Sequence, residues 1–376
     1  MANRNPFSPT FGAAPPELAG RDEVLEAIEE ALETGPTHPD YSALLIGARG
    51  TGKTVALEAA EERARSRGWL TISETAFPPE LPERIAKHAV DLLHAMGDEK
   101  ARWRVTGVRA ASMGVTVEHH DADTSPLTLR SALTALGELL KARGTGLLIT
   151  IDELQAGDIG EVREIGSILQ HVTRREGQPA AFLGAALPSI EDSLLAGDSA
   201  TFLQRCSIHE IGRLAQAATR AAIAKPIQNQ GARITAEALE AAVAATSGYP
   251  FMVQLVGFYS WRAAGNPEAG ITPAEVSEGI NEAERRISRL VLWPTWKDLS
   301  DVDRKFLIAM ASDRSESKIS DVASRLGVTV SYAGVYRRRL LRSGMITATG
   351  KGRIAFAHPA TCNWILSLAD PDGDQG

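Results

Sequence analysis

The chain has 376 residues, enough for about two or three domains, and its apolar (44%) and charged (23%) fractions are ordinary for a globular protein. This composition excludes long disordered regions. The net charge of −7 argues against a protein whose entire surface binds nucleic acid, but it is compatible with one basic domain.

Cysteines and targeting signals are sparse. Cys206 and Cys362 are the only cysteines and neither belongs to a CxxC pair, so we expect no zinc site and no disulfide framework. The first residues, MANRNPFSPTF, lack an apolar core of signal-peptide length, and no run of about 18 apolar residues occurs. We therefore expect a cytoplasmic protein without a membrane partner.

Residues 1–15 contain Asn, Pro, Gly and Ser with little periodicity, and we expect a flexible arm there. A helix is predicted next, because apolar residues recur at helical spacing from Val24 to Leu32. Residues 41–46 (YSALLI) form a short apolar run bounded by Pro39 and Gly47. This pattern predicts a buried strand.

The next stretch has the form GxxxxGK[ST], a phosphate-binding loop. It lies between the predicted strand and an Ala- and Glu-rich helix over residues 55–66, which is the context that such a loop requires. Backbone N–H groups and the helix N-terminus suit an anion, Lys53 would reach the β- and γ-phosphates, and the Thr54 hydroxyl would ligate Mg²⁺. We predict that a nucleoside triphosphate binds here. The residues of this phosphate loop are Gly47, Ala48, Arg49, Gly50, Thr51, Gly52, Lys53 and Thr54.

The region after this helix is less regular. Residues 69–73 predict a second strand and residues 81–96 a helix, whereas residues 101–124 suggest a β-hairpin insertion. His119-His120 at its end favours a solvated turn over a metal site, because adjacent histidines do not share a helix face. Ser125-Pro126 predicts the start of the next helix, as N-cap and first-turn proline.

An acidic pair follows a second apolar run. Residues 146–151 (GLLITI) predict a buried parallel strand, and Asp152-Glu153 come directly after it. Strands alternating with helices predict an α/β fold with a doubly wound parallel sheet, in which the carboxyl ends of the strands converge on one crevice. Asp152 would then serve Mg²⁺ opposite Thr54, and Glu153 would activate the attacking water. Alternatively, an Asp-Glu pair simply begins a surface helix.

Beyond about residue 200 no strong strand is predicted until the C-terminal region. Residues 214–227, 236–245 and 249–263 have helical patterns, and Thr272-Pro273-Ala274-Glu275 is a capping box that opens another helix. We expect an all-helical lid over residues 206–292, followed by a linker or docking surface in VLWPTW.

GARGTGKT and LLITIDE resemble the Walker A and Walker B motifs of the AAA+ superfamily. Four further segments resemble the origin-recognition-like and STAND-related branches of this superfamily. They are PPELAGRDEVLEAIEEAL, FLGAALPSI, TFLQRCSIHEIGRL and SGYPFMVQLVG. The resemblance implies an AAA+ nucleotide-binding core over residues 16–205, ATP and Mg²⁺ as cofactors, and ATPase activity with Glu153 as the catalytic base.

The resemblance also implies a role for Arg205, as a catalytic arginine that faces a γ-phosphate of its own chain or of a neighbouring subunit in a homo-oligomer. The alternative is a surface salt bridge. Two departures from the family pattern imply slow turnover: Ala185-Ala186-Leu187 stand where a polar sensor-1 side chain is expected, and Pro250-Phe251-Met252 where many relatives carry a sensor-2 arginine.

Residues 298–369 predict three helices followed by a two-stranded hairpin, an order that resembles a winged helix-turn-helix. Between residues 337 and 353 basic residues occur without any acidic one, which favours contacts with phosphates. We predict a disordered tail over residues 370–376. The candidate DNA-binding residues are Ser331, Tyr332, Arg337, Arg338, Arg342, Lys351 and Arg353.

Two functions fit these patterns, besides a pseudo-ATPase scaffold that does not hydrolyse ATP. The first is an ATP-driven switch that acts on duplex DNA through the winged helix. The second is a STAND-like signalling regulator whose winged helix and lid bind protein, with nucleotide exchange as the trigger. The sequence specifies neither the DNA site nor the oligomeric state nor the pathway.

Overall fold

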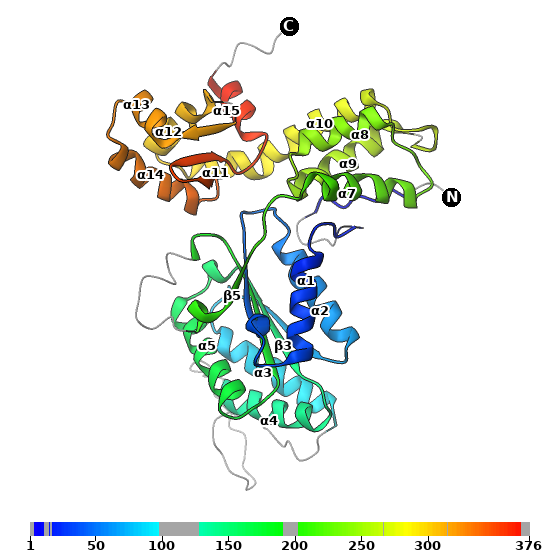
Figure 1. The fold of residues 1–376 in the computed structure, drawn as a ribbon, viewed down its shortest axis with the longest axis vertical. Helices are drawn as coiled ribbons and strands as arrows, with labels where there is room; N and C mark the ends of the chain where they lie inside the picture. The colour runs from blue at the N-terminus through cyan, green and yellow to red at the C-terminus, as the bar shows by residue number, and fades with distance from the viewer. Residues whose placement is uncertain are drawn as a thin grey trace, which may run out of the picture.

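The structure is a computed structural model, and it describes residues 4–10, 15, 17–97, 128–190, 202–265, 267–313 and 315–369. The predicted hairpin at 101–124, with His119-His120, and the predicted tail at 370–376 lie outside these residues. Figure 1 shows a sheet with its helices at one end of the molecule, and two further groups of helices side by side at the other. No described helix is long and apolar enough to span a membrane.

The sheet has five parallel strands in the order β2-β3-β4-β1-β5. The strands are β1 (Ser42–Ile46), β2 (Leu70–Thr75), β3 (Leu147–Asp152), β4 (Ala180–Ala186) and β5 (Ser207–Glu210). The predicted doubly wound sheet is therefore confirmed, but the prediction of no strong strand between about residue 200 and the C-terminal region missed β5. Because β5 pairs with β1, the sheet extends to Glu210, past the predicted boundary at residue 205.

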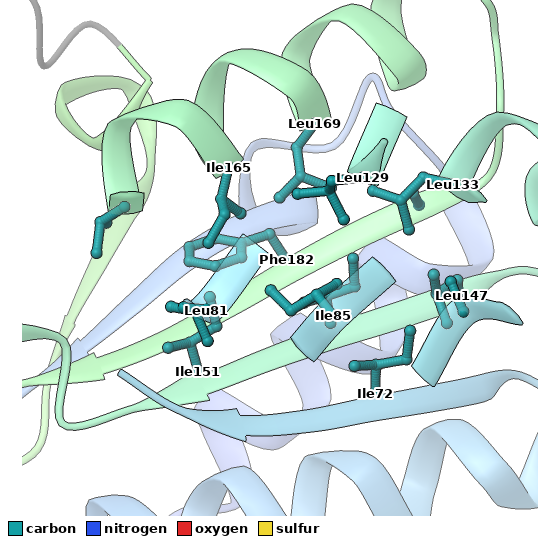
Figure 2. Close-up of a cluster of buried hydrophobic side chains, with 14 of the residues drawn as sticks. Ile72, Leu81, Ile85, Leu129, Leu133, Leu147, Ile151, Ile165, Leu169 and Phe182 are labelled. Carbon is teal, nitrogen blue, oxygen red and sulfur yellow. The ribbon is translucent and has the colours of Figure 1, made fainter. Parts of the chain in front are cut away.

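Helices cover both faces of the sheet and form two apolar cores. Leu25, Ile28 and Leu57 pack on one face together with Leu45 of β1, whereas the helices after β2 pack on the other. Figure 2 shows the second core, where Ile85, Leu133 and Ile165 from three helices meet the strands. These helices are α1 (Asp22–Thr34), α2 (Lys53–Ser66), α3 (Leu81–Ala95), α4 (Leu129–Ala142) and α5 (Ile159–Arg174).

The start of α4 differs from the prediction. Thr128 is the N-cap, and its hydroxyl accepts from the Ser131 backbone N–H while the Ser131 hydroxyl accepts from the Thr128 N–H. This reciprocal pair satisfies two backbone donors that a helix start leaves unpaired. The described helix therefore begins after Thr128, and Ser125-Pro126 lie outside the described residues.

Four helices after β5 share a separate apolar core, and we call them the helical unit: α7 (Gln216–Asn229), α8 (Ala236–Thr246), α9 (Pro250–Ala264) and α10 (Pro273–Ile287). The predicted capping box is confirmed, because the Glu275 carboxylate accepts from the Thr272 N–H at 2.8 Å. The segment expected to be a linker is helical: α10 continues through a π-helical turn (Ser288–Leu292) into α11 (Trp293–Lys297).

The last group of elements, here called the C-terminal unit, has its own core around Phe306, Val322 and Leu340. Three helices and a three-stranded antiparallel sheet of order β6-β8-β7 form it, and a fourth helix that was not predicted packs on the first. Trp364 of that helix contacts Trp296 edge-on, with ring centroids 5.5 Å apart. The elements are α12 (Asp301–Ala311), β6 (Glu316–Lys318), α13 (Ile319–Leu326), α14 (Val330–Arg342), β7 (Ile346–Gly350), β8 (Arg353–Phe356) and α15 (Thr361–Ala369).

Candidate functional site

The phosphate loop runs from the end of β1 to the start of α2, as predicted. Two of its glycines are required by geometry. A Cβ atom on Gly47 would lie 2.1 Å from the carbonyl oxygen of Ile211, and Gly52 has a φ of 89°, in the left-handed region that only glycine adopts freely. These glycines let the loop turn tightly between the sheet and the helix.

Lys53 lies across the phosphate loop and is only 6% exposed. Its ammonium group donates to the carbonyl oxygens of Gly47 and Ala48, at 2.9 and 3.0 Å. Burial lowers the pKa of Lys53, while the nearby carboxylates of Glu153 and Asp152 act in the opposite direction. The carboxylates thus help to retain a positive charge within the loop.

Thr54 and Asp152 meet although 98 residues separate them, because Thr54 lies in the first turn of α2 and Asp152 ends β3. The Thr54 hydroxyl donates to Asp152 Oδ2 at 2.6 Å. Hydroxyl and carboxylate oxygens are suitable ligands for Mg²⁺, which usually takes only one or two protein ligands and completes its shell with water and phosphate oxygens. The two side chains therefore fit the predicted Mg²⁺ site.

Glu153 follows Asp152 in a left-handed conformation, with a φ of 54°. Its backbone N–H donates to Asp152 Oδ1 at 2.7 Å and so orients the Asp152 carboxylate. The Gln155 side chain donates to Glu153 Oε2. The acidic pair precedes a short 3₁₀ turn, Leu154–Ala156, and both of its residues line the cavity next to the phosphate loop.

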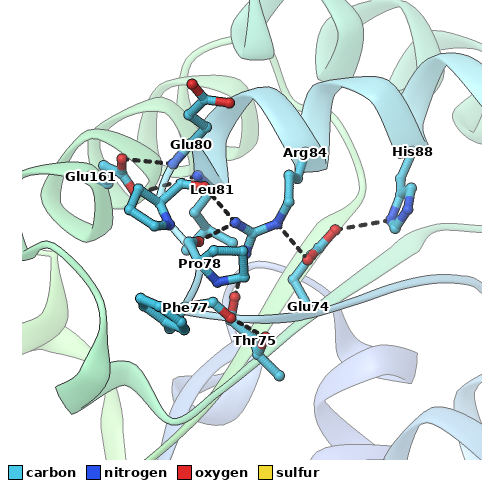
Figure 3. A network of polar contacts seen from close by, with 10 residues as sticks. Glu74, Thr75, Phe77, Pro78, Glu80, Leu81, Arg84, His88 and Glu161 are labelled. Carbon is cyan, nitrogen blue, oxygen red and sulfur yellow. Dashed lines mark hydrogen bonds and ion pairs between the residues drawn. The ribbon is translucent and has the colours of Figure 1, made fainter.

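The backbone of Asp152 is held by the neighbouring strand. Its carbonyl accepts from the Ala76 N–H at 2.9 Å. Polar contacts hold the loop after Ala76 in place (Figure 3). Arg84 donates to the carbonyls of Thr75, Pro78 and Pro79 and pairs with Glu74, while Glu161 accepts from the backbone of residues 80 and 81. This network fixes the end of β2 next to the acidic pair.

A cavity of about 490 Å³ opens over the phosphate loop. Its lining includes Lys53, Thr54, Asp152 and Glu153 on one side and mainly apolar residues of the helical unit, such as Phe251 and Val253, on the other. One wall thus suits the phosphates and the other suits an apolar, flat group such as a nucleobase.

Residues 4–10 complete this cavity, whereas a flexible arm had been expected. Phe7 is 2% exposed and packs on Gly257 of α9, and the Ser8 N–H donates to Gln254 Oε1 at 3.1 Å. Ser8 and Thr10 line the cavity. The segment is therefore docked on the helical unit.

Arg21 joins α1 to the phosphate loop and to the start of the helical unit. It is 7% exposed, and its guanidinium donates to the carbonyls of Thr51 at 3.0 Å and Gly212 at 2.6 Å. Burial lowers the pKa of Arg21. It lines the cavity, where an anion would offset the cost of burying its charge.

Residues 17–183 match the family model described as an AAA ATPase domain. This part of the chain is thus similar to AAA ATPase domains. Residues 290–365 match a second model, described as a domain of unknown function (DUF8462). No curated protein matches the chain.

Several solved structures resemble the whole chain. The Walker-type ATPase paby2304 of Pyrococcus abyssi is 14% identical, with a TM-score of 0.64, and the match covers 93% of this chain and 96% of that one. Cdc6p from Pyrobaculum aerophilum is 13% identical, with a TM-score of 0.49 and coverage of 96% and 97%. The ORC2 protein of Aeropyrum pernix is 14% identical, with a TM-score of 0.48 and the same coverage. The likeness to the Pyrococcus protein establishes the shared α/β P-loop fold, and we argue nothing from the other two.

Arg205 lies at the opposite edge of the five-stranded sheet from the phosphate loop. It precedes β5 and lines a small pocket with Tyr41, Ser42 and Ala180, at the amino ends of the strands. The phosphate loop follows the carboxyl end of β1. Arg205 therefore does not face the nucleotide cavity of its own chain.

Residues between β5 and α9 that the sequence did not reveal contact the C-terminal unit. Arg213 donates to the carbonyls of Phe356 and Ala357, at 3.0 and 3.1 Å. The ring of Tyr249 packs edge-on against His358, with centroids 4.6 Å apart, and its hydroxyl donates to the Arg49 carbonyl. Of the site residues that the sequence did not reveal, only Arg21 had a signal. It lies in the segment PPELAGRDEVLEAIEEAL, which was noted for its family resemblance.

The predicted DNA-binding residues differ in how exposed they are and in whether they form ion pairs. Ser331, Tyr332 and Arg338 are exposed on α14, and Lys351 is exposed at the tip between β7 and β8. Arg353 pairs with Glu316, which also accepts from the Thr349 hydroxyl. Arg337 is partly buried, and the side chain of Arg342 lies outside the described part of the structure.

Proposed function

We propose that this protein is a Mg²⁺-dependent ATPase of low turnover that acts as a nucleotide switch on duplex DNA. The single observation that carries the proposal is the convergence of Lys53, Thr54, Asp152 and Glu153 on one cavity whose far wall is the helical unit. A nucleotide between these walls would contact both at once. Its γ-phosphate could therefore change how the two parts lie relative to each other.

Hydrolysis requires a water molecule, aligned with the γ-phosphorus, to lose a proton as it attacks. Glu153 supplies the carboxylate that orients this water and accepts the proton, while the bond between the γ-phosphorus and the β,γ-bridging oxygen breaks and ADP leaves. Lys53 and the loop N–H groups neutralise developing charge. Mg²⁺, held by Thr54 and Asp152, would add further neutralisation of the phosphates.

Two features support a low turnover. The end of β4 presents Ala186 and Leu187, and the residues of α9 that line the cavity are Pro250, Phe251, Val253 and Gln254. None of these is cationic, so this wall adds no charge to the γ-phosphate. Such an arrangement suits a protein that holds one state for a long time.

The binding and the chemistry can be tested separately. Lys53→Ala should abolish binding of a fluorescent ATP analogue, whereas Glu153→Gln should bind it with nearly unchanged affinity and release no phosphate. Lys87→Ala, an exposed change on α3, is the matched control for loss of a lysine. Retained ATP affinity in Lys53→Ala would refute nucleotide binding at this loop.

DNA binding is proposed for the C-terminal unit, whose three helices and antiparallel hairpin have the order of a winged helix-turn-helix. Arg338 is exposed on α14, and Lys351 is exposed at the tip of the hairpin. Val335 is also exposed on α14, between Ser331 and Arg338 in the sequence, and it could contact a thymine methyl group. Arg339 pairs with Asp303 at 2.8 Å and Arg353 pairs with Glu316. Arg338 and Lys351 are thus the better candidates for phosphate contacts.

An anisotropy titration with a labelled duplex over a salt series tests this assignment. The double variant Arg338→Ala/Lys351→Ala should bind more weakly and show a salt slope smaller by about two, since each phosphate contact releases about one counterion. Arg285→Ala/Arg262→Ala on the helical unit is the matched control. Binding that is absent at low salt, or unaffected by the double variant, would exclude this DNA site.

The second candidate is a signalling regulator in which the C-terminal unit binds protein. The contacts of Arg213 and Tyr249 with this unit favour it, because they tie its position to the nucleotide domain. Limited proteolysis with ATP, ADP and no nucleotide would show release of the unit. Nucleotide-dependent release without any affinity for DNA would support this second function over the first.

A further inference from the structure

Gln155 bridges two parts of the active-site edge. It lies in the 3₁₀ turn Leu154–Ala156, directly after the acidic pair. Its side-chain oxygen accepts from the backbone N–H of Leu187 at 2.8 Å, and its side-chain nitrogen donates to Glu153 Oε2. One side chain thus connects the proposed base with the end of β4.

The orientation of the Gln155 amide is determined by its partners. The Leu187 backbone N–H can only donate, so it must meet the amide oxygen, and an ionised carboxylate can only accept, so it must meet the amide nitrogen. A flipped amide would place two donors together and two acceptors together. Both contacts are therefore satisfied in only one orientation.

The turn that carries Gln155 is itself fixed by close packing. Leu154 is buried against Gly184 of β4, where an added Cβ would lie 2.5 Å from a Leu154 methyl carbon. Gly157 lies against Ala76 at the end of β2, where an added Cβ would lie 2.7 Å from the Ala76 Cβ. The turn is thus clamped between β4 and β2, and Gln155 has little freedom to move.

The end of β4 also contacts the phosphate loop. The Gly47 N–H donates to the Ala186 carbonyl at 3.2 Å, and Leu187 is the next residue along the chain. A continuous path therefore runs from Gly47 through Ala186 and Leu187 to Gln155 and Glu153. No side chain of Ala185, Ala186 or Leu187 can make a polar contact here, so Gln155 engages the strand through its backbone instead.

We propose that Gln155 is a positioning residue for ATP hydrolysis, which holds the Glu153 carboxylate in place and links it to the end of β4 beside the phosphate loop. This inference rests on the proposed ATPase function.

The test compares three variants in steady-state ATPase assays. Gln155→Leu should lower kcat about 10- to 100-fold, as expected for a displaced catalytic group, and change the Kd for ATP less than about twofold. Gln155→Glu, of nearly the same shape, keeps an acceptor for Leu187 but loses the donor to Glu153, so its kcat should fall at least as far. Gln228→Leu, exposed on α7, is the matched control.

A double-variant cycle separates positioning from general stability. In a Glu153→Asp background, whose shorter side chain no longer reaches Gln155, adding Gln155→Leu should leave kcat within about twofold. Equal effects in both backgrounds, or parallel losses in Kd and kcat, would overturn the inference. So would a kcat of Gln155→Glu within twofold of the unmodified protein.

Failure of this inference can be distinguished from failure of the proposed ATPase function. If the unmodified protein binds ATP through Lys53 but releases no phosphate, hydrolysis and this inference are both refuted while nucleotide binding stands. If hydrolysis depends on Lys53 and Glu153 but not on Gln155, only this inference is refuted.

Discussion

The Tyr249 hydroxyl donates a hydrogen bond to the Arg49 carbonyl in the phosphate loop, and the same ring packs against His358 of the C-terminal unit. Tyr249 comes directly before α9, so one side chain joins the nucleotide loop, the helical unit and the C-terminal unit. A Cβ on Gly50 would lie 2.6 Å from this hydroxyl, which shows how closely the loop approaches it. A change of the loop would therefore reach both other parts through Tyr249.

Tyr249→Phe removes the hydroxyl and keeps the ring. We expect a loss of about 1 kcal/mol in the free energy of unfolding, or of about fivefold in ATP affinity if the loop is freed without unfolding. Urea titration and a fluorescent ATP analogue measure the two effects. Tyr259→Phe on α9 is the matched control. If neither quantity changes, the hydrogen bond does not stabilise the loop.

Stability should fall in mildly acidic solution because of His358. Burial, and secondarily the charge of Arg213, lowers the pKa of His358 from 6.5 to about 3, so the folded protein keeps it neutral while the unfolded chain takes up a proton below pH 6.5. Stability is therefore complete above pH 6.5 and is lost as the pH falls toward 3. Between pH 7 and 5 the loss should be about 2 kcal/mol.

Urea unfolding of the unmodified protein and of His358→Asn at both pH values isolates this effect. Asparagine can still accept from the Ala360 N–H, as His358 Nδ1 does at 3.1 Å, but it does not titrate in this range. The variant should be less stable at pH 7 and should lose about 2 kcal/mol less on acidification. Equal losses would contradict the buried neutral state of His358.

Phe7→Ala should release residues 4–10 from α9. The ring is buried against Gly257, and replacing a buried phenylalanine typically costs about 3–5 kcal/mol, more than so short a segment can recover from its other contacts. We expect faster hydrogen exchange at Phe7 and Ser8 and weaker ATP binding, without global unfolding. Faster exchange with unchanged affinity would show that the segment is no part of the nucleotide site. Phe77→Ala, at an exposed phenylalanine, is the control.

Arg205→Ala tests whether a second copy completes the site. Because Arg205 faces away from the nucleotide cavity of its own chain, it can contact a γ-phosphate only in a neighbouring copy. The specific ATPase activity of the unmodified protein should then rise with protein concentration, and that of Arg205→Ala should not. Arg174→Ala, which lines the same small pocket, is the matched control. Activity that is independent of both concentration and Arg205 would exclude this role.

The local parts of the fold could be predicted from the sequence. The phosphate loop, the strand before Asp152 and the helix Leu81–Ala95 follow from glycine spacing, continuous apolar runs and helical periodicity. The meeting of Thr54 with Asp152 also followed, because parallel strands bring their carboxyl ends to one edge.

The remaining parts depend on contacts that no short pattern contains. β5 has only four residues and its Ile208 is exposed at the sheet edge, so it offers no apolar run. Phe7 is an isolated aromatic residue in a polar stretch, and its burial depends on the hole left by Gly257. Gln155 and Tyr249 have roles that depend on backbone groups distant in sequence, which side-chain motifs do not predict.

The helix that continues from α10 through the π-helical turn into α11 connects the helical unit with the C-terminal unit. Its 15, 5 and 5 residues give a rod of about 35 Å, with the helical unit at one end and Trp364 packed on Trp293 and Trp296 at the other. A tilt of the helical unit by about 10° would move the far end by roughly 6 Å, about one helical turn. A tilt of the helical unit would thus be passed on to the C-terminal unit as a larger displacement.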